Sequence, residues 1–185
     1  MSQSNKQARI SFTYVLVTLA AVIVSWLIHE FAHWSTGELL GNEMVMTLNT
    51  SYPKAGIYLE DWHGTIISAA GPIITLIQAI IFYFLLKKGA GKFLFPFLLT
   101  CLYMRSVAGV MNFINLNDEG RISRDLGLGS FTLPFIIFGI LFYLVYSMAS
   151  TKEYGAKFIT ITTLLIMLFS SILILSDRAF KIEVL

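Results

Sequence analysis

The sequence predicts an all-α membrane protein of about five transmembrane helices, with a small membrane-associated β-hairpin between the first and the second. Of its 185 residues, 56% are hydrophobic and 13% are charged, whereas a soluble domain is nearer half apolar and a quarter charged. The apolar residues form runs of about 20, separated by short polar pieces, which is the hydropathy pattern of spanning helices. The chain is therefore expected to be an integral, multi-pass protein, with the cell membrane as the expected location.

Five apolar runs are long enough to cross a hydrocarbon core of roughly 30 Å at about 1.5 Å per residue. The expected helices are residues 10–34, 64–86, 93–115, 131–149 and 157–176. The first follows Lys6 and Arg9, as a secretory signal would, but it is too long for a signal core and has no small-residue cleavage site. It is expected to remain as the first span of a single domain covering residues 1–185.

The segment between the first two expected helices, residues 41–62, is too polar to span a membrane. Two short β-prone runs, residues 44–48 and 56–59, flank a cluster of turn-forming residues at 49–54. This pattern predicts a small hairpin lying against the membrane. An irregular loop is the alternative.

The charges and the single cysteine limit what the protein can do. A net charge of +2 is too small to indicate a nucleic-acid partner, and one cysteine, Cys101, excludes an intrachain disulfide. Five spans place the chain ends on opposite sides of the membrane. Lysine and arginine are slightly more frequent on the N-terminal side, which favours a cytoplasmic N-terminus by the positive-inside rule.

A short motif, His29-Glu30-Phe31-Ala32-His33, lies near the end of the first apolar run. Side chains four residues apart share one face of a helix, so His29 and His33 can bind one Zn²⁺ ion. Glu30 can then act as the general base toward water on the metal. Polar groups in an apolar helix are costly and usually functional, although at a helix end they can simply reach interfacial water.

A zinc site needs a third protein ligand. The first helix is expected to end on the side where the second begins and the third ends. His63 precedes the second helix, while Asp118 and Glu119 follow the third. Because the chain has three histidines, a three-histidine site would require His63. An acidic site would use Asp118 or Glu119, with Asp118 the first choice, and the residues alone leave these alternatives open.

Three segments together resemble the site-2 protease family of intramembrane zinc metalloproteases. The HEFAH sequence at 29–33 is similar to the first motif of that family. Residues 70–72, Ala-Gly-Pro, followed by Thr75, are similar to its A-G-P-x-x-N element, with threonine in place of asparagine. Residues 112–120, NFINLNDEG, are similar to its second metal motif but lack the proline and carry an extra glutamate. The resemblance covers residues 10–126, and the last two expected helices are accessory.

This resemblance implies an intramembrane zinc endopeptidase that cuts membrane-spanning protein substrates. It favours Asp118 as the third ligand, keeps Glu119 as the alternative, and gives His63 a neighbouring or supporting role. It also implies that the β-element can hold a substrate as an added strand, which would unwind a helical peptide and expose its backbone to the metal.

Five further residues are candidates for supporting or substrate-binding roles. Gly71 and Pro72 would begin or kink the second helix and allow close packing near the zinc. Asn112 and Asn115, three residues apart, could hydrogen-bond the substrate backbone or the third ligand, or simply cap a helix. Arg105, in the third expected helix, needs a carboxylate partner or a water-filled cavity.

Two other classes of function are compatible with the sequence. One is a non-catalytic zinc-binding membrane partner or sensor that keeps the protease fold. The other is a transporter that uses the polar residues in its spans. Stoichiometric zinc without turnover of any membrane peptide would favour the non-catalytic partner, whereas proton- or ion-coupled flux that survives Glu30→Gln would favour the transporter.

Overall fold

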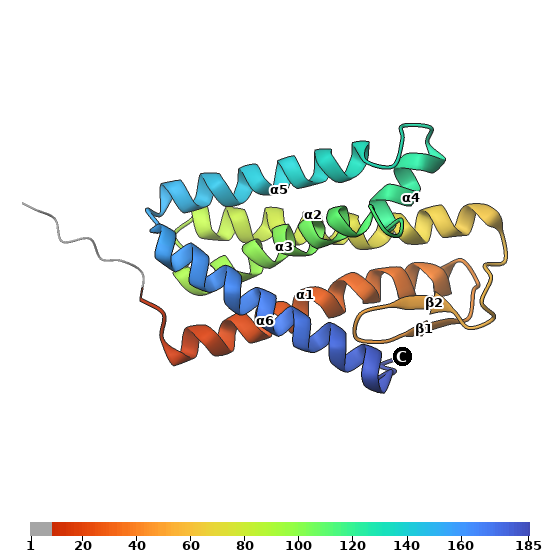
Figure 1. Cartoon of the computed structure of the whole chain (residues 1–185), viewed down its shortest axis with the longest axis horizontal. Coiled ribbons are helices and arrows are strands. Elements are labelled where there is room, and N and C mark those ends of the chain that lie inside the picture. The colour runs from red at the N-terminus through yellow and green to blue at the C-terminus, as the bar shows by residue number, and fades with distance from the viewer. Residues whose placement is uncertain (1–8) are drawn as a thin grey trace, which may run out of the picture.

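A computed structural model describes residues 9–185 (Figure 1). Within this part of the chain five long helices pack together, and the last of them crosses the first obliquely (Figure 1). Their bounds are α1 Phe12–Leu39, α2 Asp61–Lys87, α3 Phe95–Met111, α5 Thr132–Thr151 and α6 Ala156–Phe180. A 3-10 turn, η1 Lys92–Leu94, leads into α3, and the short helix α4 Asp118–Asp125 follows it. A two-stranded antiparallel sheet lies between α1 and α2, so the predicted fold class is confirmed.

Among residues 9–185, five segments are long and apolar enough to cross a membrane: α1, α2, η1 with α3, α5 and α6. Many large apolar side chains point away from the bundle, for example Phe84 of α2, Phe142 of α5 and Leu168 of α6. In a bilayer such side chains face lipid and need no cover from protein, whereas backbone polar groups must be paired within helices. The chain is therefore a multi-pass membrane protein by its length and composition.

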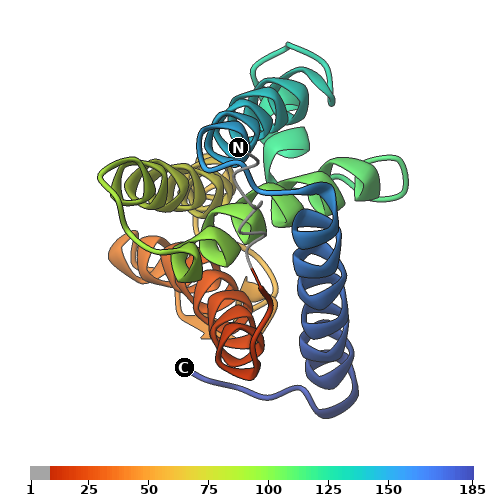
Figure 2. The same cartoon turned by 90° about the vertical axis from the view of Figure 1, so that its left-hand side faces the viewer.

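Polar pairs tie α1 to its neighbours inside the bundle. Tyr14 and Thr162 of α6 share a hydrogen bond of 3.0 Å between their hydroxyls, and Trp26 Nε1 donates to Ser170 Oγ of α6 at 3.4 Å. Such bonds between helices are favoured where water cannot satisfy the groups. Viewed along the bundle (Figure 2), α3 occupies the middle, and it packs against α1, α2, α5 and α6.

Three helix ends differ by four or more residues from those predicted, and one of them is that of α6, which continues to Phe180 rather than ending near residue 176. α1 continues to Leu39 rather than ending near residue 34, and α3 ends at Met111 rather than near 115. The early end of α3 has a side-chain cause, because Asn112 Oδ1 accepts a 2.6 Å hydrogen bond from the backbone N–H of Asn117 and so closes a turn. The helix α4 was not predicted, since eight largely charged residues give no spanning signal.

The hairpin is present, but its second strand is not where the sequence predicted it. Strand β1 is Met44–Met46 and strand β2 is Ser51–Pro53, with Met46 opposite Ser51. The prediction of a strand at 56–59 is wrong, and residues 49–54, predicted as turn, contain β2. Thr47 causes the shift, because its backbone N–H donates to Thr50 O at 2.8 Å and its hydroxyl also bonds Thr50, closing a tight turn early.

The hairpin is held on both sides. At the edge of β1 remote from β2, Met46 exchanges backbone hydrogen bonds with Val184 and Leu185 near the C-terminus. Asp177 of α6 accepts from the hydroxyl of Thr47 at 2.8 Å and from the N–H of Leu48 at 3.1 Å. On the other side, Ser51 Oγ donates to the carbonyl oxygen of Glu30 at 2.9 Å. These contacts fix β2 beside the HExxH segment of α1 (Figure 1).

Candidate metal centre

His29, Glu30 and His33 lie in the C-terminal half of α1, and all three are buried. At about 1.5 Å per residue, His29 lies roughly 26 Å along a helix that begins at Phe12, near the far boundary of a hydrocarbon core roughly 30 Å thick. Asp118 is the first residue of α4, and the turn closed by Asn112 brings it back toward α1. The site therefore joins two segments almost ninety residues apart in the sequence.

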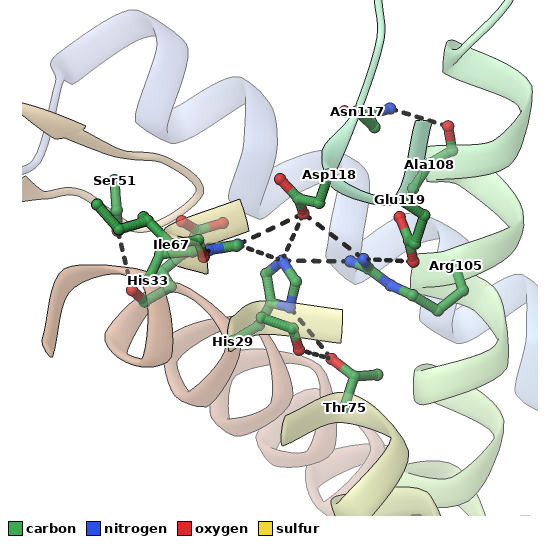
Figure 3. Close-up of polar contacts among 12 residues, drawn as sticks. His29, His33, Ser51, Ile67, Thr75, Arg105, Ala108, Asn117, Asp118 and Glu119 are labelled. Carbon is green, nitrogen blue, oxygen red and sulfur yellow. Dashed lines mark hydrogen bonds and ion pairs between the residues drawn. The ribbon is translucent and has the colours of Figure 1, made fainter. Parts of the chain in front are cut away.

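Three side-chain atoms converge on one point (Figure 3). His29 Nε2 and His33 Nε2 lie 3.2 Å apart, and each lies 3.4 Å from Asp118 Oδ2. The other carboxylate oxygen of Asp118 turns outward and accepts a 3.0 Å hydrogen bond from Arg121. This triangle of donor atoms, from His29, His33 and Asp118, could hold a metal ion.

The second nitrogen of each histidine fixes which nitrogen carries the proton. His33 Nδ1 lies 2.6 Å from the carbonyl oxygen of Ile67, which can only accept, so Nδ1 carries the proton. Thr75 Oγ1 donates to Gly71 O at 2.9 Å and therefore accepts from His29 Nδ1 at 3.1 Å. Both rings thus direct the Nε2 lone pair at Asp118. Three lone pairs facing one another repel unless a cation lies among them, and this is the arrangement that metal-binding histidines show.

Helix α2 supplies the surface on which both imidazoles rest. A Cβ atom added at Gly71 would collide with the rings of His29 and His33, so glycine is required for this approach. Pro72 lies in the interior of α2, which excludes the predicted role of beginning the helix and leaves that of kinking it. It has no N–H to donate to the carbonyl of Ser68, four residues earlier in the helix, next to the Ile67 carbonyl that accepts from His33.

We expect Thr75→Val to weaken metal binding about 10–100-fold, as loss of a partner that orients a ligand commonly does. Valine has nearly the same shape but cannot accept the proton of His29 Nδ1. Affinity is measured by competition with a chromophoric chelator. Thr75→Ser keeps the hydroxyl and should bind like the wild type. Equal affinities for the valine and serine variants would show that Thr75 does not orient His29.

Arg105 and Glu119 form a buried ion pair next to the triangle. Arg105 Nη1 donates to Glu119 Oε1 at 2.9 Å, and Arg105 Nη2 lies 3.3 Å from His29 Nε2. Glu119 therefore contacts Arg105 rather than the two histidines, although it is adjacent to Asp118 in the sequence. The carboxylate partner predicted for Arg105 is thus Glu119, with Asp118 Oδ2 farther away at 3.7 Å.

Asp118 is expected to be ionised over the whole physiological range. Burial alone would raise the pKa of its carboxyl group, but the close contacts with the imidazoles of His29 and His33 outweigh burial and hold the pKa well below its usual range. The carboxylate is consequently available as a metal ligand without the loss of a proton at neutral pH.

A cavity of about 580 Å³ lies beside the triangle. Its lining includes the side chain of Glu30, residues 49–52 of the hairpin, and apolar side chains of α1, α3 and α6 such as Trp26, Met104 and Ile174. Glu30 is not one of the three converging donors. The cavity therefore brings together a metal-binding group, a carboxylate that is free of that group, and the strand β2.

The remaining predicted residues lie away from the converging donors. His63 is buried beside Asn42, whose amide donates to His63 Nδ1 at 3.1 Å, and this pair joins the end of α1 to the start of α2. Asn112 closes the turn before α4 and packs against Gly120, where a Cβ would touch its amide. Asn115 is exposed in that turn and lines no part of the cavity.

Two contributors to the site had no assigned role in the sequence analysis. Asn117 donates from its side chain to Ala108 O at 2.8 Å and orders the approach to Asp118. The backbone carbonyl of Ile67 orients His33. Because every residue type has such a carbonyl, this role could not be predicted from the sequence. In comparisons with known proteins, no family model, no curated protein and no solved structure matched this chain.

Proposed function

We propose that this chain is an intramembrane zinc endopeptidase of the site-2 protease kind, which cuts membrane-spanning proteins. His29, His33 and Asp118 would hold Zn²⁺, and Glu30 would be the general base. The observation that carries the proposal is the convergence of three lone pairs, from two rings whose protonation is fixed and one carboxylate, beside a cavity that contains Glu30.

The donor set suits zinc. Catalytic zinc sites use three protein ligands, mainly imidazole nitrogen and carboxylate oxygen, and leave a fourth position for water or substrate. In a tetrahedral site with bonds of about 2.0–2.1 Å, ligand atoms lie about 3.3–3.4 Å apart. The three separations in the triangle are 3.2, 3.4 and 3.4 Å, which matches this requirement without movement of the backbone.

The chemistry would be hydrolysis of a peptide bond. Zinc bound here would supply Lewis acidity, which polarises a carbonyl group and makes water a stronger acid. Glu30 would accept the proton of the attacking water at its carboxylate and then deliver it to the nitrogen of the leaving amine. Burial of Glu30 among the walls of the cavity keeps bulk water from competing for that proton.

Strand β2 offers a way to hold the substrate. A transmembrane helix shields its peptide bonds with its own hydrogen bonds, so it must unwind before hydrolysis. Within residues 9–185 β2 pairs only with β1, and its residues line the cavity. An unwound segment could pair with this edge as an added strand, while the apolar walls from α1, α3 and α6 would accept its side chains.

Metal analysis of the purified full-length protein, combined with a cleavage assay, tests the proposal. We expect one zinc per chain in the wild type, and cleavage of reconstituted transmembrane peptides that stops on chelation and returns with Zn²⁺. Asp118→Asn should lose the metal, whereas the double variant Arg105→Met with Glu119→Gln should keep it, because Glu119 contacts Arg105 instead of the histidines and the double variant leaves no buried charge unpaired. Cleavage that survives complete chelation would refute the assignment. Zinc bound at one per chain without turnover of any membrane peptide would favour the non-catalytic partner instead.

A further inference from the structure

The positively charged side chain of Arg105 lies beside the three donor atoms that could hold a metal ion. Arg105 projects from α3 toward the triangle and is buried, and its Nη2 lies within 3.3 Å of His29 Nε2 (Figure 3). A buried guanidinium so close to a divalent ion would weaken metal binding by Coulomb repulsion. An arginine that serves packing alone has no physical reason to reach this far, so its position calls for a role in the chemistry.

The negative charge of Glu119 compensates the buried positive charge of Arg105 at this position. Its carboxylate accepts from Arg105 Nη1 at 2.9 Å, and both side chains are buried. A buried pair of this kind adds little net stability, because desolvation offsets the attraction. What it does provide is orientation, since Glu119 holds one edge of the planar guanidinium and leaves the Nη2 edge facing His29 and the cavity, whose lining includes Arg105.

When a metal is bound, the N–H of Arg105 Nη2 loses its acceptor, His29 Nε2. His29 Nε2 has a single lone pair, which can serve either the N–H of Arg105 or a metal ion, but not both. Once a metal takes that lone pair, Nη2 needs another acceptor on the cavity side. The oxygen of a substrate carbonyl that approaches the metal would be the nearest candidate, and a charge-assisted bond to it would strengthen as its negative charge grows.

Resting on the proposed function, we propose that Arg105 stabilises the oxyanion of the reaction, with Glu119 as its positioning residue. As the water oxygen bonds to the carbonyl carbon and Glu30 takes the water proton, the carbonyl π electrons move onto oxygen, which accepts from Arg105 Nη2. That electron pair returns when the C–N bond breaks, and the proton goes to the amine nitrogen. Arg105 and Glu119 exchange no proton in these steps.

The test uses full-length protein loaded with Co²⁺, whose visible spectrum reports on ligands at the metal. Acetohydroxamate, an anionic oxygen ligand, and imidazole, a neutral ligand, are each titrated into the wild type and into the double variant Arg105→Met with Glu119→Gln. The double variant removes both members of the ion pair, so no buried charge is left unpaired. Glu119→Gln alone shows the effect of losing the positioning residue.

We expect the double variant to bind Co²⁺ at least as tightly as the wild type, because a repelling charge is gone. Its acetohydroxamate affinity should fall about 10–100-fold, as loss of a hydrogen bond to a charged group predicts, while imidazole binding stays within about threefold, too small a change for one lost hydrogen bond to a charged group. In peptide cleavage, kcat should fall about 10²–10³-fold, the usual effect of removing one oxyanion donor.

Equal acetohydroxamate affinity in the wild type and the double variant would overturn the role of Arg105 and leave the protease proposal standing. Loss of Co²⁺ binding in the double variant would also overturn it, because the pair would then be a structural support for the ligands. If the wild type itself binds no Co²⁺, the metal site fails first, a result distinguishable from the other two.

Discussion

Glu30→Gln should abolish most peptide hydrolysis while leaving one zinc per chain. Glutamine has the shape of glutamate and keeps its oxygen, but at neutral pH it cannot take a proton from water. General acid–base catalysis contributes about 10²–10⁴-fold, so kcat should fall by that factor. Metal content should be unchanged because Glu30 is not among the three converging donors. Cleavage rates of a reconstituted transmembrane peptide and zinc analysis on the same preparation measure both quantities.

Glu43→Gln is the matched control. Glu43 is an exposed glutamate just before β1, paired loosely with Lys54 at 4.0 Å, and an exposed pair at this distance contributes little. The control variant should therefore cleave at the wild-type rate. If Glu30→Gln cleaved as fast as Glu43→Gln, Glu30 would not be the base. If Glu30→Gln lost its zinc as well, Glu30 would be a ligand, and the triangle would be incomplete as described.

The fold could be predicted because spanning helices carry a strong local signal. Each is a long apolar run with polar ends, and the bilayer leaves few alternatives for such a run. The hairpin was harder, because its strands have three residues each and their positions depend on one hydroxyl. Thr47 turns the chain back toward Thr50, and the β-prone residues 56–59 have no strand partner there.

The choice among Asp118, Glu119 and His63 could not be made from the sequence, because it depends on where a short helix begins. Successive helical residues point about 100° apart. With α4 beginning at Asp118, that side chain faces His29 and His33, whereas Glu119 faces Arg105. A start one residue later would have placed Glu119 at the position that Asp118 now occupies. The helix begins where it does because Asn112 and Asn117 fold the preceding turn.

Of the residues that support the two histidines, the sequence predicted the role of Gly71 but not that of Thr75. Gly71 was singled out for close packing, and it does lie against both imidazoles. Thr75 was noted only as a departure from an expected asparagine, yet both residues carry a side-chain oxygen that can accept from a histidine N–H. The conclusion that His29 uses that oxygen needed the distance of 3.1 Å between them. Chemistry shared by two residue types is therefore a better guide than identity at such a position.

Gly71→Ala should eliminate metal binding while leaving the membrane bundle folded. A Cβ at this position would overlap His29 Cε1 and His33 Nε2, so at least one imidazole must turn away from Asp118. Because the overlap involves both rings at once, no single rotation relieves it. The zinc affinity should fall by more than about 100-fold, beyond the range for loss of one supporting contact, and cleavage should disappear with it. Chelator competition gives the affinity, and detergent-resistant secondary structure by circular dichroism reports on the fold.

Gly139→Ala is the control, because Gly139 lies in α5, where an added Cβ meets no atom within 4 Å. Alanine favours a helix over glycine, so this variant should fold, bind zinc and cleave normally. Wild-type zinc affinity in Gly71→Ala would mean that the two rings do not rest on α2 as described, and the convergence on Asp118 would lose its main steric support. Normal zinc with lost cleavage would instead place Gly71 at the substrate. The steric argument therefore stands only if metal and activity are lost together.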